Sequence, residues 1–184
     1  QAEEQPERRQ ANHFRRIRLG QALFAWSYSF ERLSPVLEFQ SFGLEIGMTL
    51  SGARCFESRH RGEERYERGQ ISVFNLGEQY STHYEPDPLG AGREVGLLIR
   101  GDHPAASGDH IVGFPRRLEA LTDQNMLSLG SAIAHALDLG DDLQGSVDTI
   151  EAEVRSFIER YGDLVRVDAL ERARLELMRH FAKP

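Results

Sequence analysis

Short apolar runs separated by glycine and proline are the feature of this sequence that most restricts its fold. Between residues 21 and 100, turn-forming residues recur every few positions, from Pro35 and Gly43 to the group that ends at Gly92. The intervening runs have the length of strands: VLEFQ, LEIGMTL, ARCFESRH, QISVF, YSTHYE and REVGLLI. Several short strands at close turn spacing favour a sandwich or barrel over alternating strand–helix units. We therefore predict a β-domain over residues 21–115, in which residues 101–115 form a loop or linker.

The arrangement of two of these strands can be predicted further. The dipeptide Arg61-Gly62 lies between two polar arms, which is typical of a hairpin turn. Because side chains alternate across a strand, residues 53–58 divide between two faces. One face carries Arg54, Phe56 and Ser58, and the other carries Ala53, Cys55 and Glu57.

From residue 116 onward the apolar residues recur at helical spacing. In VDTIEAEVRSFIERY, residues 147–161, they fall three or four positions apart, with Ser146 as a candidate N-cap and Gly162 as a stop. A second helix is predicted over residues 124–139, weakened by Gly130. A third is predicted to begin at Asp168. Such stripes pack in a core or pair with a second copy, and we expect a homodimer formed through these C-terminal helices.

Composition narrows the function and the compartment. The formal net charge of −7 argues against a grip on phosphate backbones. With only one cysteine, Cys55, no internal disulfide can form, which fits a cytoplasmic protein. No apolar run approaches the length of a membrane span, and the N-terminus does not read as a signal peptide. Residues 1–20 are polar and arginine-rich, and we predict a flexible N-terminal arm there.

One spacing pattern resembles the second motif of the cupin superfamily. Gly69, Asn75, Gly77 and Tyr80 match it, although that family usually has proline at the position of Asn75 and a metal-binding histidine at that of Tyr80. Glycine suits the turn before the strand and a positive φ between strands. The resemblance implies an α+β fold: a cupin-like β-barrel of the jelly-roll type, followed by a helical segment.

The same resemblance places the family's other metal ligands near Met48, Leu50 and Cys55, none of which is an oxygen or imidazole ligand. A divalent metal needs several such donors converging on one point. We therefore expect a barrel with no metal and no other cofactor. His103 and His110, in the loop, are interpreted as surface residues.

No other catalytic set is visible. The sequence contains no nucleophile elbow, phosphate-binding loop or dinucleotide-binding glycine pattern. Cys55 has no neighbour that marks it as a nucleophile, and we expect it to be a buried structural thiol. The protein is accordingly not expected to be an enzyme.

The final residues, VDALERARLELMRHFAKP, resemble the segment that opens the DNA-binding half of AraC-type transcription regulators. Leu170, Ala173, Arg174 and Leu177 fit the helix of that pattern, and Lys183-Pro184 fit the break before the first helix-turn-helix. The resemblance implies a layout of three parts. Residues 1–20 are an arm that closes over the barrel in some members, residues 21–115 bind a small effector, and residues 116–184 dimerise and lead to a missing DNA-binding half. DNA contact would then belong to that half alone.

An effector site in a barrel needs an aromatic wall and a few placed polar groups. The candidates are Trp26, Arg54, Phe56, Tyr80 and His83. An arginine there would suit a carboxylate or phosphate. Two alternatives to a sensor stay open: an atypical cupin enzyme, and a cupin-like scaffold module that binds no small ligand.

Overall fold

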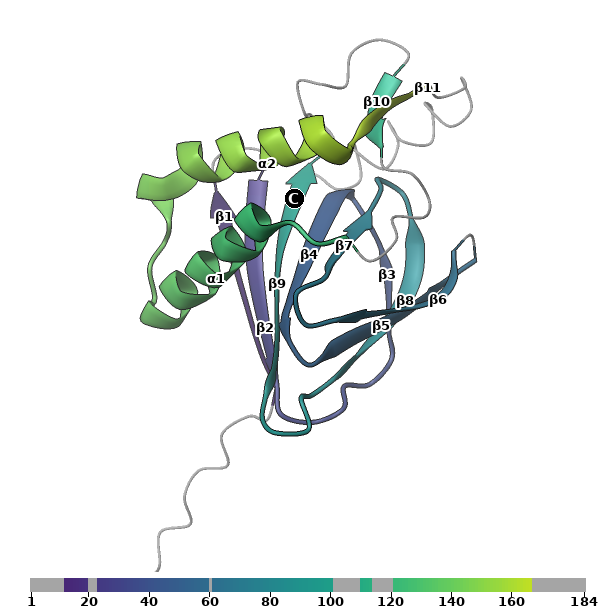
Figure 1. The fold of residues 1–184 in the computed structure, drawn as a ribbon, viewed down its shortest axis with the longest axis vertical. Helices are drawn as coiled ribbons and strands as arrows, with labels where there is room; N and C mark the ends of the chain where they lie inside the picture. Colours follow the sequence, from purple (N-terminus) through teal and green to yellow (C-terminus); the bar gives the residue numbers. More distant parts are fainter. Residues whose placement is uncertain (1–11, 20–22, 60, 101–109, 114–120, 167–184) are drawn as a thin grey trace, which may run out of the picture.

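The computed structural model describes residues 12–19, 23–59, 61–100, 110–113 and 121–166. Nine strands form two facing antiparallel sheets (Figure 1). The five-stranded sheet has the order β1-β2-β9-β4-β7, with the bounds Asn12–Leu19, Leu23–Phe30, Gly92–Arg100, Gly43–Ser51 and Ile71–Phe74. The four-stranded sheet has the order β3-β8-β5-β6, with the bounds Leu37–Gln40, Gln79–Glu85, Ala53–Ser58 and Gly62–Glu67.

The chain passes back and forth between the sheets from β4 to β9, as in a jelly roll. The predicted fold class, α+β with a cupin-like β-barrel followed by helices, is confirmed. The predicted turns also form. Gly62 begins β6 of the β5–β6 hairpin with φ +75°, and Gly69 and Gly77 have φ values of +82° and +81°. These backbone angles suit glycine because it lacks a Cβ.

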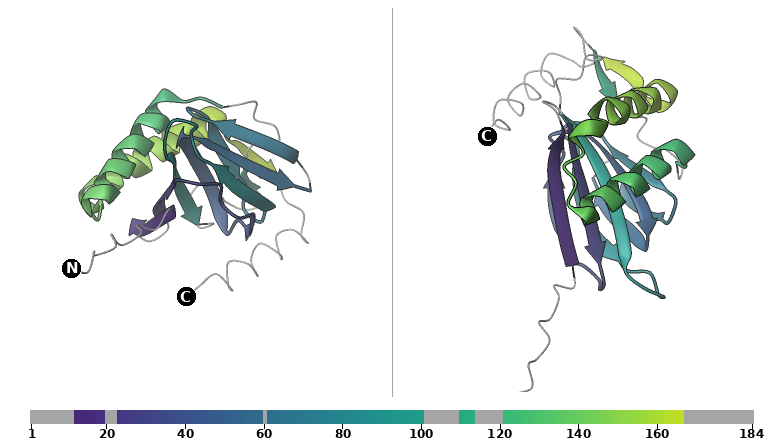
Figure 2. Two further views of the ribbon diagram at one scale, coloured as in Figure 1. Left: turned by 90° about the horizontal axis from the view of Figure 1, so that it is seen from below. Right: turned by 90° about the vertical axis from the view of Figure 1, so that its left-hand side faces the viewer.

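Two helices cover the outer face of the five-stranded sheet (Figures 1 and 2). Helix α1 spans Gln124–Leu139 and α2 spans Val147–Tyr161, both with the predicted bounds. Asp123 caps α1 by accepting a hydrogen bond from the Met126 backbone N–H at 3.0 Å. Ser146 makes no side-chain cap, because a 3₁₀ turn, η1 (Gln144–Ser146), leads into α2 instead. Neither described helix is long and apolar enough to cross a membrane.

The main hydrophobic core lies between that sheet and the helices, outside the barrel. Helix α2 contributes the residues of its predicted stripe: Ile150, Val154, Phe157 and Ile158. In α1, Gly130 lies against Met48 of β4, so the predicted weak point is a close contact between helix and sheet. The apolar stripe of α2 thus packs against the core of its own chain. Dimerisation through the helices stays a prediction.

The predicted N-terminal arm is wrong for residues 12–19, which form β1 and pair with β2 over their whole length. The run alternates: Ile17 and Leu19 pack into the core, while Arg16 and Arg18 are exposed on the other face. Arg15 shares the face of Ile17 and donates to the backbone carbonyl of Leu137 in α1. The prediction weighed the charges of this run and missed its period of two. Residues 1–11 lie outside the described part of the chain.

A second correction concerns the predicted loop. Residues His110–Gly113 form β10, which pairs with β11 (Asp163–Arg166). The two strands are separated by both helices in the sequence, so no local turn signal marks the pairing. His103 and the helix predicted from Asp168 lie outside the described residues.

Candidate functional site

The space between the two sheets is centred on a fully buried arginine, Arg54 of β5. A guanidinium has five N–H donors, and all five have acceptors here. The acceptors are Thr82 Oγ1 at 3.3 Å, Ser72 Oγ at 3.3 Å, Glu94 Oε1 at 2.9 Å, Glu45 Oε1 at 3.2 Å and Tyr80 Oη at 3.3 Å. Burial of a charge is tolerated when it is paired and hydrogen-bonded in this way. Arg54 therefore has no donor left for an acidic ligand.

Two glycines opposite each other make room for this arrangement. Gly47 of β4 and Gly96 of β9 are partners in the sheet. A Cβ at Gly47 would lie 2.5–2.8 Å from Glu94 Oε1, Ser72 Oγ and Arg54 Nη1, and a Cβ at Gly96 would overlap the Trp26 ring. The Trp26 ring and the Arg54 guanidinium thus cover neighbouring backbone positions on the inner face of one sheet.

The carboxyl group of Glu94 is the most perturbed acid in this cluster. Burial raises its pKa to about 7, with Glu45 acting in the same direction and Arg54 opposing. The Tyr84 side chain is near enough to lower the pKa of Glu94, but its geometry gives Glu94 Oε2 no hydrogen bond among the described residues. Oγ1 of Thr49, the cross-strand partner of Glu94, has none either. A buried polar atom without a partner costs about 1–3 kcal/mol. Both atoms are buried, and each can form a further hydrogen bond.

Aromatic rings connect this centre to the surface on both sides. Phe14 of β1, 57% exposed, lies 6.4 Å from Tyr28, and Tyr28 lies 4.8 Å from Tyr84 between ring centroids. The Arg54 guanidinium lies over Tyr84 at 5.6 Å and over Tyr80 at 5.5 Å. Tyr80 in turn stacks on Phe39 of β3, which is 46% exposed. Packed aromatic rings thus run without interruption from exposed Phe14 and Phe39 to the buried cluster.

The structure brings four of the five predicted site residues to the inner face. Arg54 and Tyr80 belong to the polar cluster, where the Tyr80 hydroxyl also donates to Glu45 Oε2 at 2.8 Å. Trp26 lies half-buried over Gly96. Phe56 packs in an aromatic cluster with Tyr66, Phe74 and Tyr80, which adjoins the polar cluster through Tyr80. It supports the site without reaching the carboxylates.

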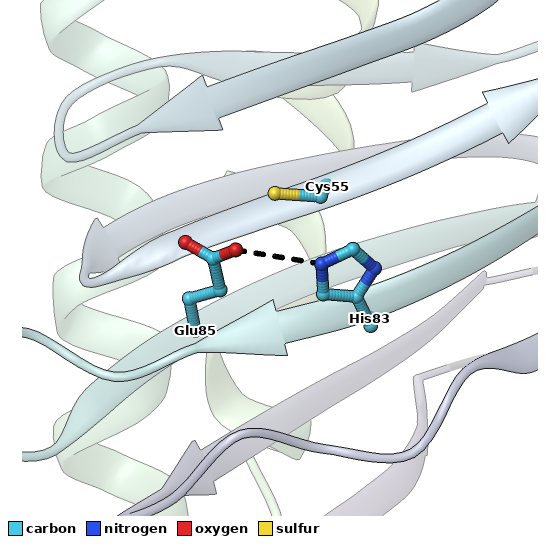
Figure 3. Close-up of side chains that lie close together, drawn as sticks. All are labelled: Cys55, His83 and Glu85. Atoms are coloured by element: carbon cyan, nitrogen blue, oxygen red, sulfur yellow. Dashed lines mark ion pairs between the residues drawn. The ribbon is translucent and has the colours of Figure 1, made fainter.

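His83 is on the opposite face, and its assignment to the site is wrong. It lies on the outer face of the four-stranded sheet beside Cys55 and Glu85 (Figure 3). Cys55 is half-buried there, not buried as predicted. Burial raises the pKa of the Cys55 thiol, and Glu85 adds to this while Arg65 opposes it. The strand follows strict alternation through β8, so no bulge returns His83 to the interior.

The four positions assigned to metal ligands by the cupin spacing do not converge. Met48 and Leu50 pack on the helix side of β4, and Cys55 lies on the outer face of β5. Only Tyr80 points inward. On β4, the neighbouring residues Gly47 and Thr49 point inward, one position away from the predicted pair, because the spacing counted residues without fixing the strand's face.

Glu45, Thr49, Ser72, Thr82, Tyr84 and Glu94 belong to the inner polar face but were not predicted. One signal was present in the sequence. Glu45 and Glu94 interrupt apolar strands, and a charge in such a run indicates a buried polar partner. Alternation from Tyr80 also places Thr82 and Tyr84 on the same face. Their common partner, Arg54, is on another strand and is evident only in three dimensions.

The strand order of the two sheets is that of a cupin-like double-stranded β-helix domain. No family model and no curated protein matches the sequence. Among solved structures, a cupin superfamily protein from Desulfitobacterium hafniense is 12% identical over 50% of this chain and 82% of its own, with a TM-score of 0.41. An RmlC-like cupin family protein from Methanocaldococcus jannaschii is 8% identical, over 53% and 87%, with a TM-score of 0.40.

The Cupin_2 domain of an XRE family transcriptional regulator from Enterobacter cloacae is also similar, with 11% identity over 49% of this chain and 97% of its own and a TM-score of 0.39. A putative mannose-6-phosphate isomerase from Ralstonia eutropha has a TM-score of 0.42 with 13% identity. Similarities at this level assign neither a family nor an activity to the chain.

Proposed function

We propose that this chain is the effector-sensing domain of an AraC-type transcription regulator, and that it binds a small molecule between its sheets without a metal ion or catalysis. The observation that carries the proposal is the inner polar cluster. Glu94 Oε2 and Thr49 Oγ1 have no hydrogen-bond partners in the part of the chain that the structure describes, and aromatic rings connect the cluster to exposed Phe14 and Phe39. Ligand sites combine an apolar wall with a few convergent polar groups in this manner.

The charges of the cluster favour one class of effector. Arg54 is saturated by its five acceptors, while two carboxylates, Glu45 and Glu94, face one cation. Above pH 7, where Glu94 is ionised, an added carboxylate or phosphate would meet surplus negative charge, whereas a hydrogen-bond donor would satisfy Glu94 Oε2. We therefore propose an effector with an aromatic or apolar body and an amine, amide or hydroxyl donor. This replaces the expectation of an acidic effector that the arginine alone suggested.

The proposed arrangement of the remaining parts of the protein rests on the resemblance of the C-terminal residues to AraC-type regulators. The helices pack on the back of the same sheet that carries Glu94 and Gly96. Effector binding would then alter how the sheet supports a homodimer in the cytoplasm, and DNA contact would belong to a following domain. A ligand shifts such an equilibrium only by its difference in affinity for the two arrangements.

A thermal-shift screen with matched compounds tests the effector class. Each pair shares one aromatic body and carries either an amine or a carboxylate. The amine member is expected to raise the melting temperature, by an amount equivalent to about 2.7 kcal/mol at 100 times its Kd. Because Trp26 is the only tryptophan, its fluorescence is expected to change in the same titration.

Glu94→Gln is the informative variant, because the amide keeps the shape and loses the acceptor charge. It is expected to weaken binding of an amine at least tenfold, while Glu38→Gln, an exposed control on β3, leaves binding unchanged. If only carboxylate members bind, or if Trp26 and Glu94 do not respond, the proposed site is wrong.

The regulator assignment has a separate test in the gene. We expect the reading frame to continue beyond Pro184 and to encode two helix-turn-helix segments, each with a recognition helix for the major groove. A gene that encodes neither segment would overturn the AraC assignment and leave the binding site untouched.

A further inference from the structure

Three metal-ligating side chains come together on the outer face of the four-stranded sheet, away from the site proposed above. Cys55 of β5 and His83 of β8 are direct cross-strand partners, and Glu85 is the next residue on the same face of β8. Figure 3 shows the three side chains side by side on adjacent strands. One ligand atom from each lies within 4.8 Å of the other two, and His83 Nε2 is 3.5 Å from Glu85 Oε1.

The three donors suit one type of ion. A thiolate, an imidazole and a carboxylate are the ligands that Zn²⁺ takes, at bond lengths of about 2.0–2.3 Å in tetrahedral geometry. Donors in such a site are roughly 3.3–3.8 Å apart. Side-chain rotations on the fixed backbone of two paired strands would close the remaining gap. Three protein donors would also leave the fourth position for water or another ligand.

A positive group already occupies the edge of this cluster. Arg65 of β6 donates from Nη1 to Cys55 Sγ at 3.4 Å and to Glu85 Oε2. Its side chain is 49% exposed, and its Nε also bonds to Glu67 Oε1 at 3.3 Å. Glu67 gives Arg65 a partner if it leaves Cys55 and Glu85. The Cys55 sulfur and the Glu85 carboxylate thus already bind a cationic group. A metal ion could displace this group, the Arg65 guanidinium.

We propose that Cys55, His83 and Glu85 form a Zn²⁺ site on the outer face of the sheet, with Arg65 as the competing cation. Zn²⁺ binding would displace the proton of the Cys55 thiol to solvent, and the resulting thiolate and the Glu85 carboxylate would balance the charge of the ion. Binding would fasten β5 to β8, whose opposite faces carry Arg54 and Tyr80 of the inner cluster. The site is independent of any effector between the sheets.

Metal titration of the full chain tests the site. Isothermal titration with Zn²⁺ is expected to show one site per chain, and Co²⁺ is expected to give the visible and thiolate charge-transfer bands of tetrahedral cobalt bound to sulfur. Cys55→Ser should abolish the charge-transfer band and His83→Asn should weaken Zn²⁺ binding at least tenfold. Arg65→Gln removes the competitor and should tighten binding severalfold.

Glu57→Gln is the matched control, because Glu57 lies on the same face of β5 as Cys55 but outside the cluster. It should bind Zn²⁺ as the wild type does. Circular dichroism without metal establishes that each variant is folded. Wild-type protein that gives no thiolate–cobalt band, or Cys55→Ser protein that binds Zn²⁺ unchanged, would overturn the proposal. The latter result would assign the metal to other histidines of the chain.

Discussion

At the scale of single residues, the inner cluster shows how one cation organises two acids. Arg54 lies at 2.9 Å from Glu94 and 3.2 Å from Glu45, in a place where Arg54 and Glu94 are excluded from water. The charges do not balance when both acids are ionised. Burial raises the pKa of Glu94 to about 7, so the imbalance exists only above this pH, where both acids are ionised.

This carboxyl predicts a pH-dependent stability. Its pKa rises from 4.5 to about 7 on folding, so between these values the unfolded chain has lost a proton that the folded chain keeps. The stabilisation is complete below pH 4.5 and is lost as pH rises through about 7. It amounts to about 3 kcal/mol, at about 1.4 kcal/mol per pKa unit. Chemical denaturation of the wild type and of Glu94→Gln from pH 4.5 to pH 8.5 measures it.

The difference in unfolding free energy between the two proteins isolates Glu94 from the other titrating groups. We expect the wild type to lose stability relative to Glu94→Gln as pH rises through 7. A difference that does not vary with pH would mean that Glu94 titrates normally in the folded protein.

At the scale of elements, a pair of glycines shapes the inner face of strands β4 and β9, and a capping aspartate fixes the start of helix α1. The pair Gly47 and Gly96 lets side chains from other strands lie on the backbone. The cap at Asp123 joins both helices, because Arg160 of α2 bonds to its second oxygen at 3.0 Å. The bounds of both helices were predictable from periodicity. The roles of the glycines were not, because each depends on a side chain from elsewhere in the chain.

Gly96→Ala is expected to displace Trp26. The added methyl would overlap the indole ring, and overpacking of this kind costs about 1–3 kcal/mol. The fluorescence of the displaced tryptophan should shift to longer wavelength, which steady-state emission spectra detect. Gly90→Ala, where an added Cβ has nothing within 4 Å, should leave the spectrum unchanged. An unshifted spectrum for Gly96→Ala would contradict the placement of the ring.

Asp123→Ala is expected to destabilise the helical layer. The variant loses the N-cap, which contributes about 1 kcal/mol, and also the ion pair with half-exposed Arg160. Asp123→Asn keeps the cap oxygen and should lose less than half as much. Urea denaturation followed by far-ultraviolet circular dichroism compares the three proteins. Equal losses for the two variants would show that the ion pair, not the cap, fixes the start of α1.

At the scale of the whole molecule, the domain has two interiors of different character. The apolar core lies between the five-stranded sheet and the helices, and the space between the sheets holds aromatic and polar side chains. Stability and binding are therefore separated onto the two faces of one sheet. A site can then carry unpaired polar atoms without weakening the main core.

Phe157→Ala tests whether the apolar stripe of α2 packs against its own chain or against a second copy. Phe157 is completely buried in the core, and its truncation should cost about 3–5 kcal/mol. If the contact is within one chain, the loss will be the same at protein concentrations that differ tenfold. Leu139→Ala, at an exposed position on α1, should change stability by less than about 0.5 kcal/mol. A loss that grows on dilution would place the stripe of α2 at a dimer interface.

The sequence by itself determined the strands from residue 37 to residue 100, the two helices and the face of β5 that carries Arg54 and Phe56, because periodicity and turn chemistry are local. Only the tertiary structure decided that Asn12–Leu19 joins the sheet, that β10 pairs with β11 and that His83 faces outward with Cys55. It also placed Glu45 and Glu94 on either side of Arg54. These facts depend on contacts between residues far apart in the chain, and no short-range pattern specifies them.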